Sequence, residues 1–262
     1  MPRLRLDQVL VERGIAPSRA AAQAMLLAGE VEIPGRGRAL KAGNLVESDV
    51  ELHVRERPRW ASRAGEKLAA ALGAFGVDPA GAVALDAGAS TGGFTDVLLE
   101  RGAARVYAVD VGRGQLLDRL ARDPRVVSME RTNLRTLTAL PESIQLATLD
   151  LSFISLRLVL PAVRGLLAPD GQVVALVKPQ FEAGKDAVPR GGVIRDAAVH
   201  GAVLERFAGA GAAAGFGVAG LMRSPIVGGD GNVEFLAHLV APPGIAPEAL
   251  AEQIRVLTAP SG

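Results

Sequence analysis

Short apolar runs alternate with helical patterns through the middle of the chain, and this alternation constrains the fold more than any other feature. The apolar runs lie at 83–86, 106–110, 126–129, 144–150 and 173–178, and helical patterns lie between them at 93–101, 115–122 and 155–167. Near-continuous apolar strands separated by helices are typical of a parallel sheet covered on both faces. The sequence therefore predicts an α/β fold, preceded by a helix with an apolar stripe at Leu68, Leu72 and Phe75.

The C-terminal part continues the pattern with one change. A helix is expected at 197–208, followed by strands at 218–222 and 233–240. Only a short connection joins these last two strands, which favours an antiparallel pair. We therefore expect a mostly parallel sheet with an antiparallel edge strand.

Residues 1–57 have the pattern of a small separate α+β domain. An apolar stripe predicts a helix that stops at Gly14, and Ser18 suits the N-cap of a second helix that ends at Gly29. Alternating apolar residues at 31–33 and 50–54 indicate short strands. Residues 58–61 form the expected linker, with Trp60 packing against the next domain, and residues 62–262 form the second domain.

Composition excludes several kinds of chemistry. The chain has no cysteine, which excludes disulfides, thiolate metal ligands and a thiol nucleophile, and its three histidines have no ligand spacing, so we expect no metal. No apolar run is long enough to span a membrane, and the N-terminus is too polar for a signal peptide. We expect a cytoplasmic protein with no membrane partner. The net charge of +1 does not by itself indicate a nucleic-acid partner.

A loop of small residues joins the run at 83–86 to the helix at 93–101. Small residues let the backbone approach a ligand, and loops after parallel strands are the usual ligand sites. A dinucleotide loop would need glycine at the position of Ser90, so the spacing resembles instead the S-adenosylmethionine loop of Rossmann-like methyltransferases. Asp110, after the next strand, is placed for the ribose hydroxyls of either cofactor, and Asn133 for adenine. The expected cofactor-binding residues are Asp86, Gly88, Ser90, Gly92, Gly93, Asp110, Asn133 and Asp150.

Lysine is rare in this chain, and its positions are informative. Only Lys41, Lys67, Lys178 and Lys185 stand among 29 basic residues. Compositional bias explains why lysine is rare but not where it remains. A lysine whose pKa is lowered by burial and a nearby cation can take a proton from a hydroxyl, whereas arginine stays protonated.

Four charged residues are expected near the loop. Asp150 ends the fourth strand, Lys178 ends the fifth, Glu234 lies early in the last strand, and Lys67 lies in the helix that enters the domain. Each is ordinary when taken alone. In order, Lys67, Asp150, Lys178 and Glu234 resemble the catalytic tetrad of FtsJ/RrmJ-like ribose methyltransferases.

A closer resemblance is to the TlyA family, whose members are named both as haemolysins and as ribosomal RNA 2′-O-methyltransferases. It implies transfer of a methyl group from S-adenosylmethionine to a cytidine ribose in ribosomal RNA or ribosomal subunits, with Lys178 assisting deprotonation. The nucleotide, the subunit and the oligomeric state stay open. The matching segments are 62–68, 85–95, 107–116, 130–135, 150–155 and 178–182.

The N-terminal domain resembles the ribosomal S-four-type RNA-binding domain. The match runs from Arg3 through Gly14, Ser18-Arg19 and Gly29 to Asp49-Val50. In that family the second helix and the following turn hold structured RNA. The resemblance implies RNA-binding roles for Arg3, Arg19, Arg36, Arg38 and Lys41.

The same residues bear on other methylation reactions and on other functions. Methylation at pyrimidine C5 commonly uses a cysteine, and amino methylation commonly uses an Asp/Asn-Pro-Pro-aromatic loop, where this chain has Asp150-Leu151-Ser152-Phe153. Ribose is therefore the best-supported acceptor. The alternatives are a non-catalytic RNA-binding or ribosome-assembly factor and a membrane-active haemolysin.

Overall fold

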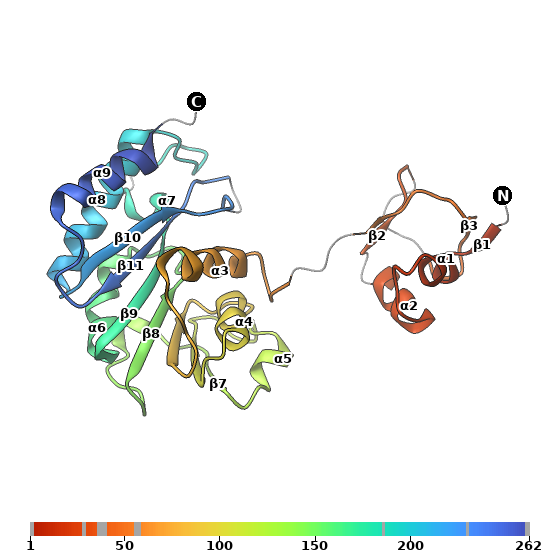
Figure 1. Cartoon of the computed structure of the whole chain (residues 1–262), viewed down its shortest axis with the longest axis horizontal. Helices are drawn as coiled ribbons and strands as arrows, with labels where there is room; N and C mark the ends of the chain where they lie inside the picture. Colours follow the sequence, from red (N-terminus) through yellow and green to blue (C-terminus); the bar gives the residue numbers. More distant parts are fainter. Residues whose placement is uncertain are drawn as a thin grey trace. The chain divides into compact units, whose positions relative to one another are not determined.

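The computed structural model describes residues 3–27, 30–35, 41–54, 59–184, 187–228 and 231–259. The chain divides into two compact units, Met1–Pro58 and Arg59–Gly262 (Figure 1). Each unit has its own apolar core.

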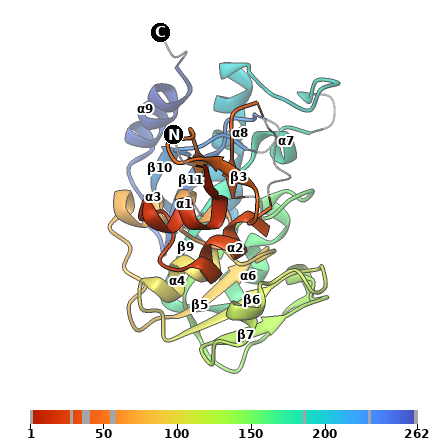
Figure 2. The same cartoon turned by 90° about the vertical axis from the view of Figure 1, so that its right-hand side faces the viewer.

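The larger unit is built on a seven-stranded sheet in the order β10-β11-β9-β8-β5-β6-β7. In Figure 2 the strands follow one another from β10 and β11 down to β7. The five strands from β9 to β7 are parallel, and β11 is antiparallel to both β9 and β10. The strands are β5 (Val83–Ala87), β6 (Arg105–Val109), β7 (Val126–Met129), β8 (Ile144–Leu149), β9 (Leu167–Val177), β10 (Gly217–Arg223) and β11 (Phe235–Val240).

Helices cover both faces of this sheet, as the apolar strand pattern predicts. Alternate strand residues point to opposite faces, so Leu85 packs in the layer under α6, α8 and α9, whereas its neighbour Ala84 packs under α3 and α4. The helices are α3 (Ala64–Phe75), α4 (Gly93–Glu100), α5 (Asp118–Ala121), α6 (Leu160–Leu166), α7 (Pro179–Glu182), α8 (Ala197–Ala213) and α9 (Pro247–Thr258), with 3-10 turns η1 (Leu134–Thr136) and η2 (Leu156–Leu158).

Local sequence sets several helix ends. Gly76 ends α3 in the left-handed region at φ 66°, which glycine adopts without steric cost. The carboxylate of Asp196 caps α8 by accepting a hydrogen bond from Ala198 N. Proline stands in the first turn of α6, α7 and α9, where its missing N–H is harmless.

The predicted fold class is confirmed, with differences at element ends. The helix expected at 155–167 divides into η2 and α6, and it ends at Leu166 because β9 begins at Leu167. Glu234 directly precedes β11 rather than lying within it. Trp60 is buried against α3 and α4, as expected, and its Nε1 donates a hydrogen bond to Glu100. Among the described helices, none combines the length and hydropathy that a bilayer span requires.

The described residues of the smaller unit form two helices and two short antiparallel ribbons. β1 (Arg3–Arg5) pairs with β3 (Leu45–Glu47), and β2 (Val31–Glu32) pairs with β4 (His53–Val54). Helices α1 (Leu6–Glu12) and α2 (Arg19–Leu27) pack through Leu6, Leu10 and Leu26. Ser18 Oγ accepts a hydrogen bond from Ala21 N, as its expected N-cap role requires.

Candidate functional site

The loop between β5 and α4 is shaped by residues with positive φ. Gly88 has φ 85°, and a Cβ there would lie 2.4 Å from the carbonyl oxygen of Asp150. Ser90 adopts φ 46°, which is uncommon for a residue with a side chain. The loop therefore lies against the residue that follows β8, so the ends of two neighbouring strands meet.

Asp86 requires a correction. It was expected at the cofactor, but it is fully buried beneath the loop and lines neither of the two cavities beside that loop. The hydroxyl of Thr95 donates a hydrogen bond to it at 2.6 Å, and that of Thr148 does so at 3.3 Å. Burial raises the pKa of Asp86 to about 7, and the nearby charge of Asp150 acts in the same direction. Asp86 therefore joins β5 to α4 and β8 instead of facing a ligand.

Asp110 lies where a ribose-binding carboxylate is expected. Its Oδ2 accepts a hydrogen bond from Ser90 N at 2.8 Å, and its Oδ1 accepts one from Gly112 N at 2.7 Å. These bonds fix the carboxylate at the loop. Each oxygen keeps a second lone pair, so the carboxylate can still accept two ribose hydroxyls.

A cavity of about 300 Å³ opens beside the loop. Gly88, Ser90 and Asp110 line one side, and Asn133 lines it together with Thr132 and Leu134. The Asn133 side chain caps η1 by accepting a hydrogen bond from Arg135 N. The cavity lies where the strand order changes direction between β5 and β8, which is the usual ligand position in such sheets.

A second cavity of about 210 Å³ shares four wall residues with the first: Gly88, Ser90, Asp150 and Ser152. Lys178 lines this second cavity, which places its amine beside the first one. Gly93, at the start of α4, also lines it, whereas Gly92 packs towards Leu116 and Leu120.

Lys178, which lines the second cavity, forms an ion pair with Asp150, which lines both cavities. Lys178 Nζ lies 2.7 Å from Asp150 Oδ1 and donates a hydrogen bond to Ser152 Oγ at 3.1 Å. Asp150 Oδ1 is buried and has no aligned hydrogen-bond donor among the described residues.

Lys67 and Glu234 form a second ion pair. Lys67 Nζ donates to Glu234 Oε2 at 2.5 Å, and the two side chains are 10% and 3% exposed, so the pair is largely shielded from water. A Cβ on Gly228 would lie 2.6 Å from Glu234 Oε1, so this glycine leaves room for the carboxylate.

The strand register brings the two pairs to one edge of the sheet. Phe235 of β11 pairs with Val177 of β9, so the next step of this antiparallel ladder sets Glu234 opposite Lys178. Asp150 follows β8, which runs parallel to β9. All four predicted catalytic residues therefore lie at the carboxyl edge of the parallel strands.

The predicted RNA-binding residues lie in the smaller unit. Arg3 lies in β1, Arg19 begins α2 and Lys41 begins a turn at 41–44. Arg36 and Arg38 lie outside the described residues. Arg19 forms an ion pair with Asp7, a contact that the sequence reasoning missed.

Three further residues at the larger site were also missed. Ser152 hydrogen-bonds Lys178, and Gln115 lines the first cavity. Phe153, 91% exposed at φ 64°, lines the same cavity, and its ring lies 5.2 Å from that of Phe181. The signal that could have found them is their position in segments 107–116 and 150–155, which carry the family resemblance.

Several known proteins are similar to this chain. The FtsJ-like methyltransferase family model matches residues 60–240. YqxC of Bacillus subtilis, which carries the name of an rRNA methyltransferase, is 49% identical over 90% of this chain and 85% of its own length. The 16S/23S rRNA (cytidine-2′-O)-methyltransferase TlyA of Mycobacterium tuberculosis is 47% identical over 90% of both chains. A solved structure from Streptococcus thermophilus that carries the name hemolysin is 42% identical, with a TM-score of 0.74 over 98% of this chain and 96% of that one.

Proposed function

Because this chain belongs to the TlyA family of FtsJ-like methyltransferases, we propose that it methylates a ribose 2′-hydroxyl in ribosomal RNA. S-adenosylmethionine is the proposed methyl donor, and the name of the mycobacterial relative supports cytidine as the nucleotide. A ribosomal substrate would place the activity in the cytoplasm. One observation carries the proposal: Lys178, which lines the second cavity, forms an ion pair with Asp150, which lines both cavities.

The first cavity suits the cofactor. Its volume of about 300 Å³ lies at the lower end of the range of small-molecule sites. The Asp110 carboxylate would hold the ribose hydroxyls, and Asn133 with Leu134 would border adenine. S-adenosylmethionine, when bound, supplies a methyl carbon already activated by its sulfonium sulfur.

The chain's own residues would then align and activate the acceptor. When neutral, Lys178 Nζ would take the proton of the 2′-hydroxyl as that oxygen is methylated. Asp150 positions the lysine amine and stabilises the ammonium that results. The Lys67–Glu234 pair would hold the adjoining end of β11, so that Glu234 stays opposite Lys178.

The smaller unit is proposed to bind the RNA. Its resemblance to S-four-type domains, together with Arg3, Arg19 and Lys41 on described elements, supports this role. Residues 1–57 would then form the RNA-binding domain, 58–61 the linker and 62–262 the methyltransferase domain. A 2′-hydroxyl acceptor makes RNA, and not DNA, the substrate.

The test is methyl transfer to purified ribosomal subunits and to free ribosomal RNA, with the modified nucleotide mapped by mass spectrometry. Lys178→Met should lower kcat about 100-fold or more, the size of effect that general base catalysis contributes. Cofactor affinity, measured by calorimetry, should stay near the wild-type value. Arg122→Met, at an 81% exposed side chain, is the matched control and should keep wild-type activity.

Two outcomes would contradict the proposal. Wild-type kcat in the Lys178→Met variant would exclude this lysine as the base. A wild-type protein that binds ribosomal RNA, but neither binds S-adenosylmethionine nor transfers its methyl group, would favour the non-catalytic assembly factor.

A further inference from the structure

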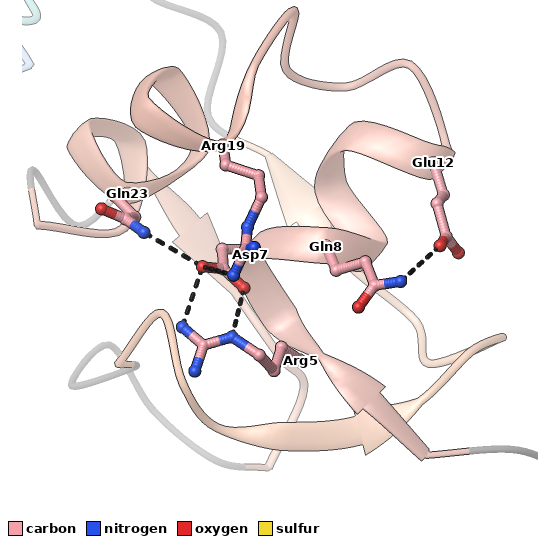
Figure 3. A network of polar contacts seen from close by, with 6 residues as sticks. All are labelled: Arg5, Asp7, Gln8, Glu12, Arg19 and Gln23. Carbon is pink, nitrogen blue, oxygen red and sulfur yellow. Dashed lines mark hydrogen bonds and ion pairs between the residues drawn. The ribbon is translucent and has the colours of Figure 1, made fainter.

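A carboxylate with no solvent exposure lies in the smaller unit. Asp7, in the first turn of α1, is 0% exposed, whereas two arginines that contact it are 45% and 59% exposed. Figure 3 shows the Asp7 carboxylate between Arg5, Arg19 and Gln23. The Arg5 guanidinium, with smaller contributions from Gln23 and Arg19, holds the pKa of Asp7 below its usual range against the effect of burial. The group is therefore a charged carboxylate at any physiological pH.

Arg5 and Arg19 are each bound to the Asp7 carboxylate and keep further N–H donors that a ligand could use. Arg5 makes a two-pronged contact, from Nε to Oδ1 and from Nη2 to Oδ2, both at 3.0 Å. Arg19 Nη2 donates to Oδ2 at 3.2 Å. A guanidinium carries five N–H donors, so these bonds occupy two on Arg5 and one on Arg19. The remaining donors have no hydrogen-bond partner among the described residues.

A third cation, Lys41, lies on a turn that is hydrogen-bonded to the start of α1. Leu6 N donates to Asn44 O at 2.8 Å, and Asp7 N donates to Ala42 O at 3.1 Å, so the turn at 41–44 is bound to the start of α1. A Cβ on Gly43 would lie 3.4 Å from Arg5 Nη1, which places the Arg5 guanidinium over this turn. Lys41 begins the turn, and its N donates to Asn44 Oδ1.

We propose that Asp7 is a positioning residue that holds the guanidiniums of Arg5 and Arg19 ready to bind one phosphate group of the RNA backbone. Planar guanidiniums bind phosphate oxygens through paired N–H donors, and an arginine already held in one geometry loses less side-chain entropy on binding. Lys41 adds a third cation at the rim. The site rests on the proposed function, because the phosphate belongs to the RNA substrate.

For the substitution Asp7→Asn, net charge and the positioning role predict opposite changes in RNA affinity. Asp7→Asn removes one negative charge, so charge alone would tighten RNA binding. Loss of positioning should instead weaken binding to purified ribosomal RNA about tenfold, as the loss of one charge-assisted hydrogen bond does. The KM for RNA should rise while kcat at saturating RNA stays at the wild-type value.

Glu12→Gln is the matched control. Glu12 lies on the same helix, exposed and bonded to Gln8 rather than to an arginine (Figure 3). It makes the same change in charge, and its affinity for RNA should equal or slightly exceed that of wild type. Both variants are compared by circular dichroism at a temperature at which each is folded.

A charge-neutral variant covers the case in which Asp7→Asn does not fold. Arg5→Lys, at a half-exposed side chain, keeps the charge but cannot make the two-pronged contact. It should also weaken RNA binding severalfold, with cofactor affinity unchanged.

Wild-type RNA affinity in a folded Asp7→Asn protein, or in Arg5→Lys, would overturn the inference and make the network purely structural. Methyl transfer by the wild-type protein would still stand in that case, so the failure of the site and the failure of the proposed function are separate results.

Discussion

Asp86 shows how burial, together with the nearby charge of Asp150, can couple one residue to pH. Its folded-state pKa of about 7 lies above the value of an unfolded aspartate, near 3.8. Between those two values the folded chain binds more protons than the unfolded chain, so the free energy of unfolding falls as pH rises. The fall is on the order of a few kcal/mol between about pH 4 and pH 7, at roughly 1.4 kcal/mol per pKa unit.

Asp86→Asn should remove this dependence. The measurement is chemical denaturation of both proteins from pH 4.5 to pH 7.5. The pKa of Glu182 is also raised by burial, and burial lowers the pKa of His200 and of His238, so only the difference between variant and wild type reports on Asp86. Asp118→Asn, at an 88% exposed carboxylate, should follow the wild-type curve. A difference curve that is flat with pH would refute the effect.

The sequence could predict the residues of the site better than their partners. Lys178 and Asp150 were predicted together because both follow parallel strands whose carboxyl ends share an edge. Lys67 and Glu234 are 167 residues apart, and only the fold shows that they form an ion pair. For Asp86, a position at the end of an apolar strand could not distinguish a carboxylate that faces a ligand from one bonded beneath the loop.

At the scale of elements, the loop between β5 and α4 depends on Gly88. An alanine Cβ there would lie 2.4 Å from a backbone oxygen, which cannot move aside as a flexible side chain can. Gly114 offers a matched comparison, since it has φ 63° and nothing within 4 Å of its Cβ position. Gly114→Ala should cost about 1–2 kcal/mol for the left-handed backbone alone.

Gly88→Ala should lose more stability than Gly114→Ala and should also lose S-adenosylmethionine binding. Thermal unfolding and calorimetric titration of the two variants measure this difference. Equal unfolding temperatures together with retained cofactor affinity would show that the loop adapts without its glycine.

Elements with strong apolar patterns were predictable, and short polar ones were not. The predicted limits of the strand at 126–129 agree with β7, and β5, β6 and β8 begin or end within one residue of expectation. β1 and β3 were missed, since Arg3-Leu4-Arg5 is only three residues long and mostly exposed, and its pairing with residues 45–47 is long-range. Helix α9 was also missed, although Leu250, Ile254 and Leu257 have helical spacing and pack against the core.

At the scale of the whole molecule, the two units carry complementary chemistry. The larger one, Arg59–Gly262, holds both cavities and both lysine–carboxylate pairs, on which the proposed cofactor binding and methyl transfer rest. The smaller one holds Arg5 and Arg19 on the buried carboxylate of Asp7, with Lys41 on the turn bound to the same helix. The net charge of +1 conceals this local excess of positive charge.

Removal of residues 1–58 should therefore separate the two activities. The remaining unit keeps its own core, so its affinity for S-adenosylmethionine should match that of the full chain. Its affinity for ribosomal RNA should fall, and the slope of log affinity against log salt should become shallower by roughly one for each lost phosphate contact. Filter binding across a salt series measures the slope, and calorimetry measures the cofactor affinity. An unchanged slope would mean that the larger unit alone makes the phosphate contacts, which would remove the basis for the RNA-binding role of the N-terminal module.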